Sequence, residues 1–404
     1  MGNPHVLVIP YPTQGHVIPL AELSQSLVKH GFKITFVNSE FNHERVMNAL
    51  AKKVDGSIRL VSIADGMEDG ESKKHLGKLT EAIRQVMPGG LKEFIKKTNR
   101  SEDDKITCVL ADINMGVQKL IDDGLIDENG SPINKHKMFQ LSPTMPAMLS
   151  TNISWACLGD FTTQKIMFDH IQRNNKVVDK VDWLFCNSSY DLEPEGFNLA
   201  PKVLHIGQFQ QEICQQPQSY MLHLPASPFL IKANSRNWLW GLELSNRPFL
   251  WVVKPDITKG TNDYYPKGFQ ERVTNQGRMV SWEPQHRVLV HPSIACFISH
   301  CGWNSTVEGV SNGVPFLCWP DSGDQFINEN YVCDIWKVGL KFTRDERGMV
   351  TRQEIKNKVE QLLGNENFKG RALTLKEMTR NSVKEGGSSN RIFNNFTEWI
   401  KSLT

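Results

Sequence analysis

Apolar and polar residues alternate along the first third of the chain as strand, turn and helix. A short apolar run at 5–12 ends in prolines, which is typical of a buried parallel strand. Residues 19–31 then carry apolar side chains at helical spacing, with a proline near the start and a glycine at the end. The runs at 32–39 and 58–66 predict a second and a third strand. Because crossovers between parallel strands are right-handed, this beginning predicts a doubly wound sheet.

The second half of the chain repeats the pattern. Residues 351–365 have a threonine N-cap, a glutamate three residues on and a glycine stop, which predicts a capping-box helix. An amphipathic helix over 390–403 ends the sequence. We therefore predict an α/β protein of two Rossmann-like, doubly wound domains, with the site in the crevice between them. Four more strands are expected, at 247–253, 278–282, 294–300 and 314–320.

Composition narrows the function classes. The 404 residues are 39% hydrophobic and 22% charged, with a net charge of +2. Lysine and arginine are scattered, so a nucleic-acid partner is not expected. No apolar run is long enough to span a membrane, and the N-terminus lacks the signal-peptide pattern. None of the eight cysteines forms a CxxC pair, and we expect reduced thiols and a cytoplasmic location.

The polar turn in FISHCGWNSTVEG follows an apolar strand and opens a helix. The first backbone N–H groups of a helix lack internal partners and carry partial positive charge, so such a turn suits phosphate. Gly302 allows close approach, and His300, Asn304 and Ser305 can donate to phosphate oxygens. Glu308, one helical turn on, can accept from sugar hydroxyls. From these residues alone, the polar cap of an ordinary strand–turn–helix remains an alternative.

The surrounding sequence carries a longer motif. Residues 282–325 read WEPQHRVLVHPSIACFISHCGWNSTVEGVSNGVPFLCWPDSGDQ. The order W-x-P-Q, H-C-G-W-N-S, E-G, G-V-P, W-P and D-Q strongly resembles the donor-binding signature of plant family 1 UDP-glycosyltransferases. The resemblance extends from PYPTQGH near the start to the final helix. It implies the GT-B fold, in which two Rossmann-like domains face each other across a cleft and the last helix returns to the first domain.

The resemblance assigns the nucleoside end of the donor. It implies that Trp282 stacks on the uracil ring. Glu283, where family members usually have a small residue, would make its contact through the backbone. Gln285 and Glu308 would hold the ribose hydroxyls.

The resemblance also assigns the phosphate and sugar end. His300, Asn304 and Ser305 would hold the diphosphate beside Gly302, in place of a metal ion, so UDP-glucose is expected as a donor substrate without a metal or other cofactor. A glutamine at the end of the motif resembles glucose-using members. The residues expected around the sugar are Trp303, Asp324 and Gln325.

A second centre lies in TQGH. A lone histidine is more often structural, and an aspartate at a strand end is usually a turn former. The resemblance instead implies that His16, expected at the end of the first strand, is the general base and that Asp112, in CVLAD, fixes its tautomer and stabilises the imidazolium. The acceptor oxygen would attack the anomeric carbon directly, with inversion from α to β. The acceptor would be a small lipophilic phenol, flavonoid, terpenoid or hormone-like alcohol.

Two segments depart from the family pattern. After Asp112, a helix–strand–helix block of the relatives is missing, which would remove a strand from the first sheet and part of the acceptor wall. Residues 218–240 do not match the expected strand and glycine–serine turn, and their letters fit a coding frame read one base out of register. A divergent loop is the alternative. In either case we expect the first strand of the second domain to be lost, because LPASPF is a poor central strand.

These expectations define the domains. An acceptor-binding domain would span 1–205, an aberrant linker 206–240 and a UDP-sugar-binding domain 241–385, with the helix at 386–404 packing back on the first domain. Two other functions remain open. The chain could be a catalytically dead remnant or aberrant gene product of the family, or it could bind a UDP-sugar without transfer.

Overall fold

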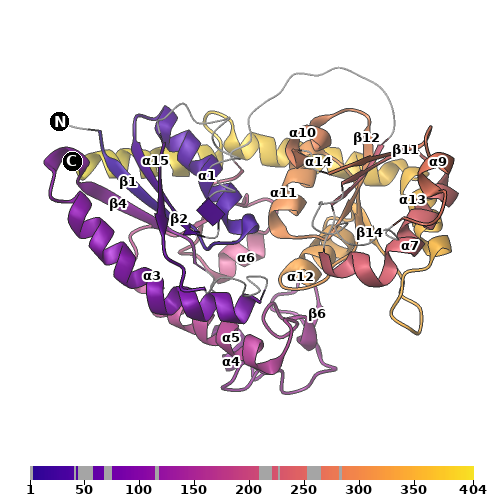
Figure 1. The fold of residues 1–404 in the computed structure, drawn as a ribbon, viewed down its shortest axis with the longest axis horizontal. Coiled ribbons are helices and arrows are strands. Elements are labelled where there is room, and N and C mark those ends of the chain that lie inside the picture. Colours follow the sequence, from indigo (N-terminus) through magenta and orange to yellow (C-terminus); the bar gives the residue numbers. More distant parts are fainter. Residues whose placement is uncertain are drawn as a thin grey trace.

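The computed structural model describes most of the chain. Two separate sheets, each flanked by helices, form an α/β architecture of two domains (Figure 1). The described residues are 3–40, 42–43, 58–67, 75–113, 118–208, 221–225, 228–252, 265–281 and 284–404.

The first sheet has the order β3-β2-β1-β4, and all of its pairs are parallel. Val6, Leu7 and Val8 are fully buried, as a strand covered on both faces requires. The predicted strands near 5–12, 32–39 and 58–66 are confirmed. The strands are β1 (His5–Ile9), β2 (Lys33–Ser39), β3 (Ile58–Ile63) and β4 (Ile106–Ala111).

The first helix begins earlier than the pattern predicts. Helix α1 spans Gln14–Lys29, so Pro19 lies inside it and His16 lies in its first turn rather than at the end of a strand. The sequence pattern placed the helix start at the proline, because proline is common in the first turn and breaks the hydrogen-bond ladder further in. Here Pro19 is the sixth residue, where its ring is tolerated but its missing N–H leaves the carbonyl of Gly15 without a helical partner.

Helices α3, α5 and α4 of the first domain lie below this sheet in Figure 1. Helix α5 lies against α3. The pairs β5–β6 and β7–β8 are short and separate from the four-stranded sheet. These elements are α3 (Leu76–Thr98), α4 (Gln118–Asp122), β5 (Met138–Phe139), β6 (Met148–Leu149), α5 (Phe161–Asn175), β7 (Phe185–Cys186), α6 (Pro194–Leu199) and β8 (Leu204–His205).

The second sheet has the order β11-β10-β9-β12-β13-β14 and is parallel throughout. Together with the first sheet it confirms the predicted pair of Rossmann-like domains. Its strands are β9 (Met221–Pro225), β10 (Phe249–Val252), β11 (Gly277–Val280), β12 (Ile294–Ser299), β13 (Phe316–Cys318) and β14 (Gly339–Lys341). Its helices are α7 (Pro228–Ser245), α9 (Phe269–Arg272), α10 (Gln285–Val290), α11 (Trp303–Asn312), α12 (Gln325–Asn330), α13 (Arg352–Leu363) and α14 (Glu366–Val383).

The expectation that the first strand of this domain is lost is wrong. Strand β9 lies in the middle of the sheet, between β10 and β12. Its proline, Pro225, is the last residue of the strand and pairs with Val252, the last residue of β10. The missing N–H of a proline costs little where the ladder ends, so LPASPF supplies a strand end and not a strand centre. Residues 209–220, which include the start of the segment read as out of frame, lie outside the described residues.

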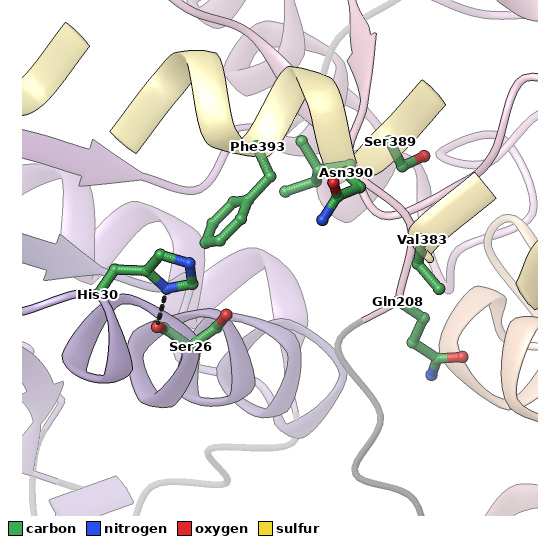
Figure 2. A pocket seen from close by; sticks show the side chains of 8 residues that line it. Ser26, His30, Gln208, Val383, Ser389, Asn390 and Phe393 are labelled. Atoms are coloured by element: carbon green, nitrogen blue, oxygen red, sulfur yellow. Dashed lines mark hydrogen bonds between the residues drawn. The ribbon is translucent and has the colours of Figure 1, made fainter. Parts of the chain in front are cut away.

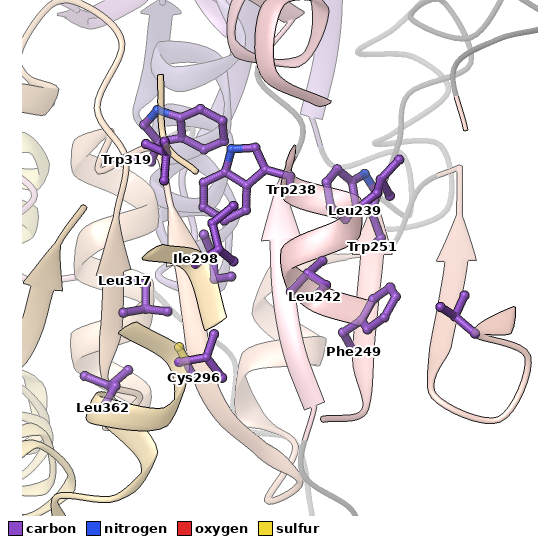
Figure 3. Close-up of a cluster of buried hydrophobic side chains, with 14 of the residues drawn as sticks. Trp238, Leu239, Leu242, Phe249, Trp251, Cys296, Ile298, Leu317, Trp319 and Leu362 are labelled. Atoms are coloured by element: carbon purple, nitrogen blue, oxygen red, sulfur yellow. The ribbon is translucent and has the colours of Figure 1, made fainter. Parts of the chain in front are cut away.

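Helix α7, most of which lies in the segment expected to be aberrant, supplies the centre of the second core. Trp238, Leu239 and Leu242 are at most 1% exposed. The indole of Trp238 stacks on that of Trp319, with ring centroids 4.0 Å apart, and Ile298 lies beside it (Figure 3). The apolar face of α7 therefore covers one side of the sheet.

Helix α15 (Ser388–Ser402) ends the chain on the first domain, whereas α14 packs against α11 of the second (Figure 1). Phe393, Phe396 and Ile400 join the core formed by β1 and α1. The chain thus crosses between the domains twice, before β9 and before α15. A cavity of about 240 Å³ lies where α1, the residues after β8 and α15 meet, and His30, Gln208, Asn390 and Phe393 are among the residues that line it (Figure 2).

The place of α7 in the core predicts unequal effects for two neighbouring tryptophans. Trp238→Ala should lower the free energy of unfolding by about 3–5 kcal/mol, because it removes a fully buried indole. Trp240 is only half-buried, so Trp240→Ala should cost clearly less. Chemical denaturation followed by circular dichroism gives both values. Equal, small losses for the two variants would mean that α7 does not belong to the core.

Candidate active site

The catalytic pair expected from the sequence is assembled by the first sheet. Strands β1 and β4 are neighbours, and the N–H of Asp112 donates to the carbonyl of Ile9 at 3.0 Å. Asp112 follows β4, and His16 lies just beyond the end of β1, in the first turn of α1. The carboxyl ends of adjacent parallel strands meet at one edge of a sheet, which brings the two side chains together. His16 Nδ1 lies 2.6 Å from Asp112 Oδ2.

The surroundings of His16 favour its protonated form. Burial lowers its pKa, but the hydrogen bond and the charge of Asp112, with a contribution from the charge of Asp324, raise the pKa above the ordinary value. An imidazole that donates from Nδ1 to a carboxylate keeps Nε2 available to take a proton. The pair has the geometry of a general base with an orienting carboxylate.

Two further aromatic rings line this centre. The Tyr11 ring meets the His16 ring edge-on, with centroids 5.3 Å apart, and its hydroxyl lies 2.7 Å from Thr80 Oγ1. The ring of His170, on α5, lies 6.1 Å from that of Tyr11. Burial, together with the charge of Arg173, lowers the pKa of His170, so its imidazole is held neutral. Tyr11 stands in the PYPTQGH motif, whereas no local signal in the sequence distinguishes His170.

Residues 300–302, expected to hold the diphosphate and called the diphosphate turn below, join β12 to α11. Cys301 has a left-handed backbone, with φ of 63°, and Gly302 is the N-cap of α11 without a side-chain cap. A Cβ on Gly302 would come within 2.5 Å of His300 Nε2, so the imidazole lies directly over the glycine. The turn therefore places a ring nitrogen and the first N–H groups of a ten-residue helix together, as anion binding requires.

The structure brings together the residues expected at the ribose. Gln285 begins α10, and its Nε2 donates to Ser305 Oγ at 3.0 Å and to Glu308 Oε2 at 2.9 Å. Ser305 and Glu308 lie on one face of α11, three residues apart. Trp282 and Glu283, expected at the uracil, lie outside the described residues.

Two residues of the first turn of α11 also make contacts within the protein that the motif does not predict. Trp303 packs against the core of its own domain, with its ring centroid 6.4 Å from that of Trp336. Asn304 reaches the first domain instead: its Nδ2 donates to the carbonyl of Gly15, and its Oδ1 accepts from Asn187 Nδ2 at 2.8 Å. Consecutive helical residues point about 100° apart, so the two side chains cannot serve the same surface.

The loop expected at the sugar contacts both domains. Gln325 Oε1 accepts from the N–H groups of Asp321 and Ser322, at 2.8 and 3.1 Å, which leaves its NH₂ for a ligand. Asp324 is exposed and accepts from Asn328 Nδ2 at 2.8 Å. The N–H of Gly323 donates to Cys157 Sγ of the first domain at 3.1 Å. The charge of Asp324 contributes to the raised pKa of His16, so this loop lies near the His16–Asp112 pair across the domain boundary.

The described residues contain neither a metal-binding cluster nor a membrane-spanning helix. Within the described ranges, no group of three or more His, Cys, Asp or Glu side chains could hold a metal ion. No described helix is long and apolar enough to cross a membrane.

Known proteins share this arrangement. The family model for UDP-glucuronosyl and UDP-glucosyl transferases matches residues 238–384. The chain is 38% identical to UDP-glycosyltransferase 83A1 of Arabidopsis thaliana, over all of this chain and 98% of that protein. It is 27% identical to (R)-mandelonitrile beta-glucosyltransferase of Prunus dulcis, over 96% and 95% of the two chains.

The solved structure of Phytolacca americana UGT2, complexed with UDP-2-fluoro-glucose and pterostilbene, superposes with a TM-score of 0.79. The superposition covers 98% of this chain and 99% of that one at 22% identity, and it shows the shared GT-B fold.

The alignment with the Arabidopsis protein also shows a difference in length. It spans 467 positions, although this chain has 404 residues, so at least 63 aligned positions have no residue here. Nevertheless the alignment includes the whole chain at 38% identity. The donor motif, the His16–Asp112 contact and the two-domain fold are all present. The chain therefore belongs to the plant family 1 UDP-glycosyltransferases, which are transferases that use UDP-sugar donors.

Proposed function

We propose that this chain transfers glucose from UDP-glucose to a hydroxyl of a small lipophilic acceptor, with inversion at the anomeric carbon. The observation that carries the proposal is the His16 Nδ1–Asp112 Oδ2 contact of 2.6 Å. It lies at the edge of the first sheet, near the loop that holds Asp324. The influence of Asp324 on the pKa of His16 supports the same placement, because it relates the base to a residue of the sugar loop.

The proposed chemistry needs one proton transfer and one displacement. His16 Nε2 takes the proton of the acceptor hydroxyl as the oxygen attacks the anomeric carbon. The bond from that carbon to the diphosphate oxygen breaks, and its electron pair leaves with UDP. Attack opposite the leaving group converts the α-linked sugar into a β-glucoside. Asp112 stabilises the imidazolium, and the N-terminus of α11 with His300 stabilises the charge that develops on UDP.

The choice of glucose and of the acceptor class rests on the motif and on relatives. Gln325 ends the donor motif, as in glucose-using members, and its free NH₂ can donate to a sugar hydroxyl. The relatives named above act on or bind mandelonitrile and pterostilbene, which are both small and carry a hydroxyl group. The seven described cysteines are free thiols, which supports a reducing, cytoplasmic setting.

One observation favours a second candidate, UDP-sugar binding without transfer. The 63 or more missing positions are consistent with the block expected after Asp112, which would carry part of the acceptor wall. The donor motif at residues 282–325 lies outside that block. A chain that keeps this motif but has an open acceptor side would bind UDP-glucose and turn over slowly.

The proposed base predicts separate effects on transfer and on donor binding. His16→Ala should lower acceptor-dependent UDP release by about 10²–10⁴-fold, and Asp112→Asn by a comparable factor, because each removes part of the base. UDP affinity, measured by titration calorimetry, should stay within about twofold, since neither residue belongs to the diphosphate turn. His30→Ala, on the exposed end of the same helix, is the control and should remain active. Transfer by His16→Ala at the parental rate would overturn this assignment. UDP binding without measurable transfer by the parent would favour the second candidate.

The raised pKa of His16 predicts an acid limb in the pH profile. The base acts only when deprotonated, so kcat/KM should rise with pH through a pKa above 6.5. Asp112→Asn removes the two largest influences that raise this pKa and leaves the burial that lowers it. The acid limb of the variant should therefore move to lower pH, at a much lower plateau. A limb at unchanged pH would show that His16 is not the titrating base.

A further inference from the structure

One contact holds the two catalytic helices together across the cleft. Asn304, in the first turn of α11, donates from Nδ2 to the carbonyl of Gly15, in the first turn of α1. Gly15 directly precedes His16 in the chain. The side chain of Asn304 therefore connects the diphosphate turn directly to the residue before the proposed base.

Pro19 explains why this carbonyl can accept. In an α-helix the carbonyl of residue 15 would accept from the N–H of residue 19. Pro19 has no N–H, so Gly15 lacks that helical partner. The side chain of Asn304 supplies a donor from the other domain. The proline within α1 thus has a consequence at the active site and not only in the helix.

The orientation of the Asn304 amide follows from the chemistry of its neighbours. A backbone carbonyl can only accept, so Asn304 must turn its NH₂ group toward Gly15. Its oxygen then points to Asn187, which must present a donor. Asn187 Nδ2 does so at 2.8 Å. With the amide in this orientation, the second N–H of Asn304 remains for an acceptor such as a phosphate oxygen.

Asn187 is held firmly for this task. It follows β7, and the next residue is fixed twice: Ser188 Oγ donates to Glu193 Oε2 at 2.7 Å, and the N–H of Gly207 donates to the Ser188 carbonyl at 2.9 Å. At the far end of the loop, the carbonyl of Leu192 accepts from Trp336 Nε1 of the second domain at 3.0 Å. Loop 187–193 is therefore anchored to the second domain at both ends.

We propose that Asn187 is a positioning residue for the transfer reaction. Through Asn304 it keeps an amide N–H directed at the diphosphate and holds the turn that carries His16 at a fixed distance from the donor. Asn187 acts through Asn304 and need not touch the substrate. The inference rests on the proposed function, because it assumes that the diphosphate binds at the N-terminus of α11.

Two substitutions at this position distinguish orientation from bulk. Asn187→Ala removes the donor and should weaken UDP affinity and kcat/KM by about tenfold at every pH. Asn187→Asp presents a carboxylate oxygen to the Asn304 oxygen. The Asn304 amide then either keeps two oxygens in contact or turns over, which loses its bond to the Gly15 carbonyl and directs its oxygen toward the phosphate side, so the loss should be larger. As the pH falls from about 8 toward the ordinary aspartate pKa of about 4, the carboxylate introduced by Asn187→Asp gains a proton and can donate again, so the deficit of this variant should shrink. A purely structural role gives no such recovery.

The measurements are UDP affinity by calorimetry and acceptor-dependent UDP release, each divided by the parental value at the same pH. This ratio cancels the titration of His16 and of Glu193, whose pKa burial raises to about 7. Asn198→Asp, on the exposed face of the neighbouring helix α6, is the matched control. Thermal unfolding checks that each variant is folded.

Each outcome decides the proposal. A pH-independent deficit for Asn187→Ala with a recovering deficit for Asn187→Asp supports it. Both variants behaving like Asn198→Asp would overturn it, even if the parent is an active transferase. A parent that binds UDP but transfers no sugar contradicts the proposed function alone, and the affinity ratios still test Asn187. A parent that binds no UDP contradicts both.

Discussion

The N-termini of two helices meet across the cleft, and the site depends on that meeting. Helix α1 carries His16 and helix α11 carries the diphosphate turn, and the Asn304–Gly15 hydrogen bond joins them. The partial positive charge of a helix N-terminus suits the phosphates on one side. On the other side, the carboxylate of Asp112 offsets the desolvation of an imidazolium. In the proposed function, the base and the leaving group have opposite electrostatic needs, and these two helix N-termini serve one each.

Each domain packs a small segment into the core of the other. Loop 187–193 of the first domain sends Leu192 into the core of the second, where it is 2% exposed. The final helix α15 leaves the second domain and packs Phe396 and Ile400 into the core of the first. Such exchanges restrict how far the domains can separate, since each would expose apolar surface.

The segment at 218–240, which departs most from the family pattern, still forms regular secondary structure. Residues 218–240 do not match the expected strand and glycine–serine turn, yet they include the central strand β9 and most of helix α7, whose Trp238 is 1% exposed. Binary patterning and a proline at the strand end suffice for the backbone. They do not restore the glycine–serine turn that the family pattern predicts here, because that turn is a matter of residue identity and not of fold.

Local features of the sequence were enough to identify both Rossmann-like sheets and the turn before α11, because strand periodicity and a contiguous motif are written in neighbouring residues. The pair His16 and Asp112 came only from the resemblance to the family, because the two residues lie 96 positions apart. Only the tertiary structure decided where Asn304 donates, that Trp303 joins the core, and that Tyr11, His170, Cys157 and Asn187 belong to the site. These contacts join residues up to 289 positions apart in the chain. They depend on how two separately folded sheets pack, and no short-range pattern records that.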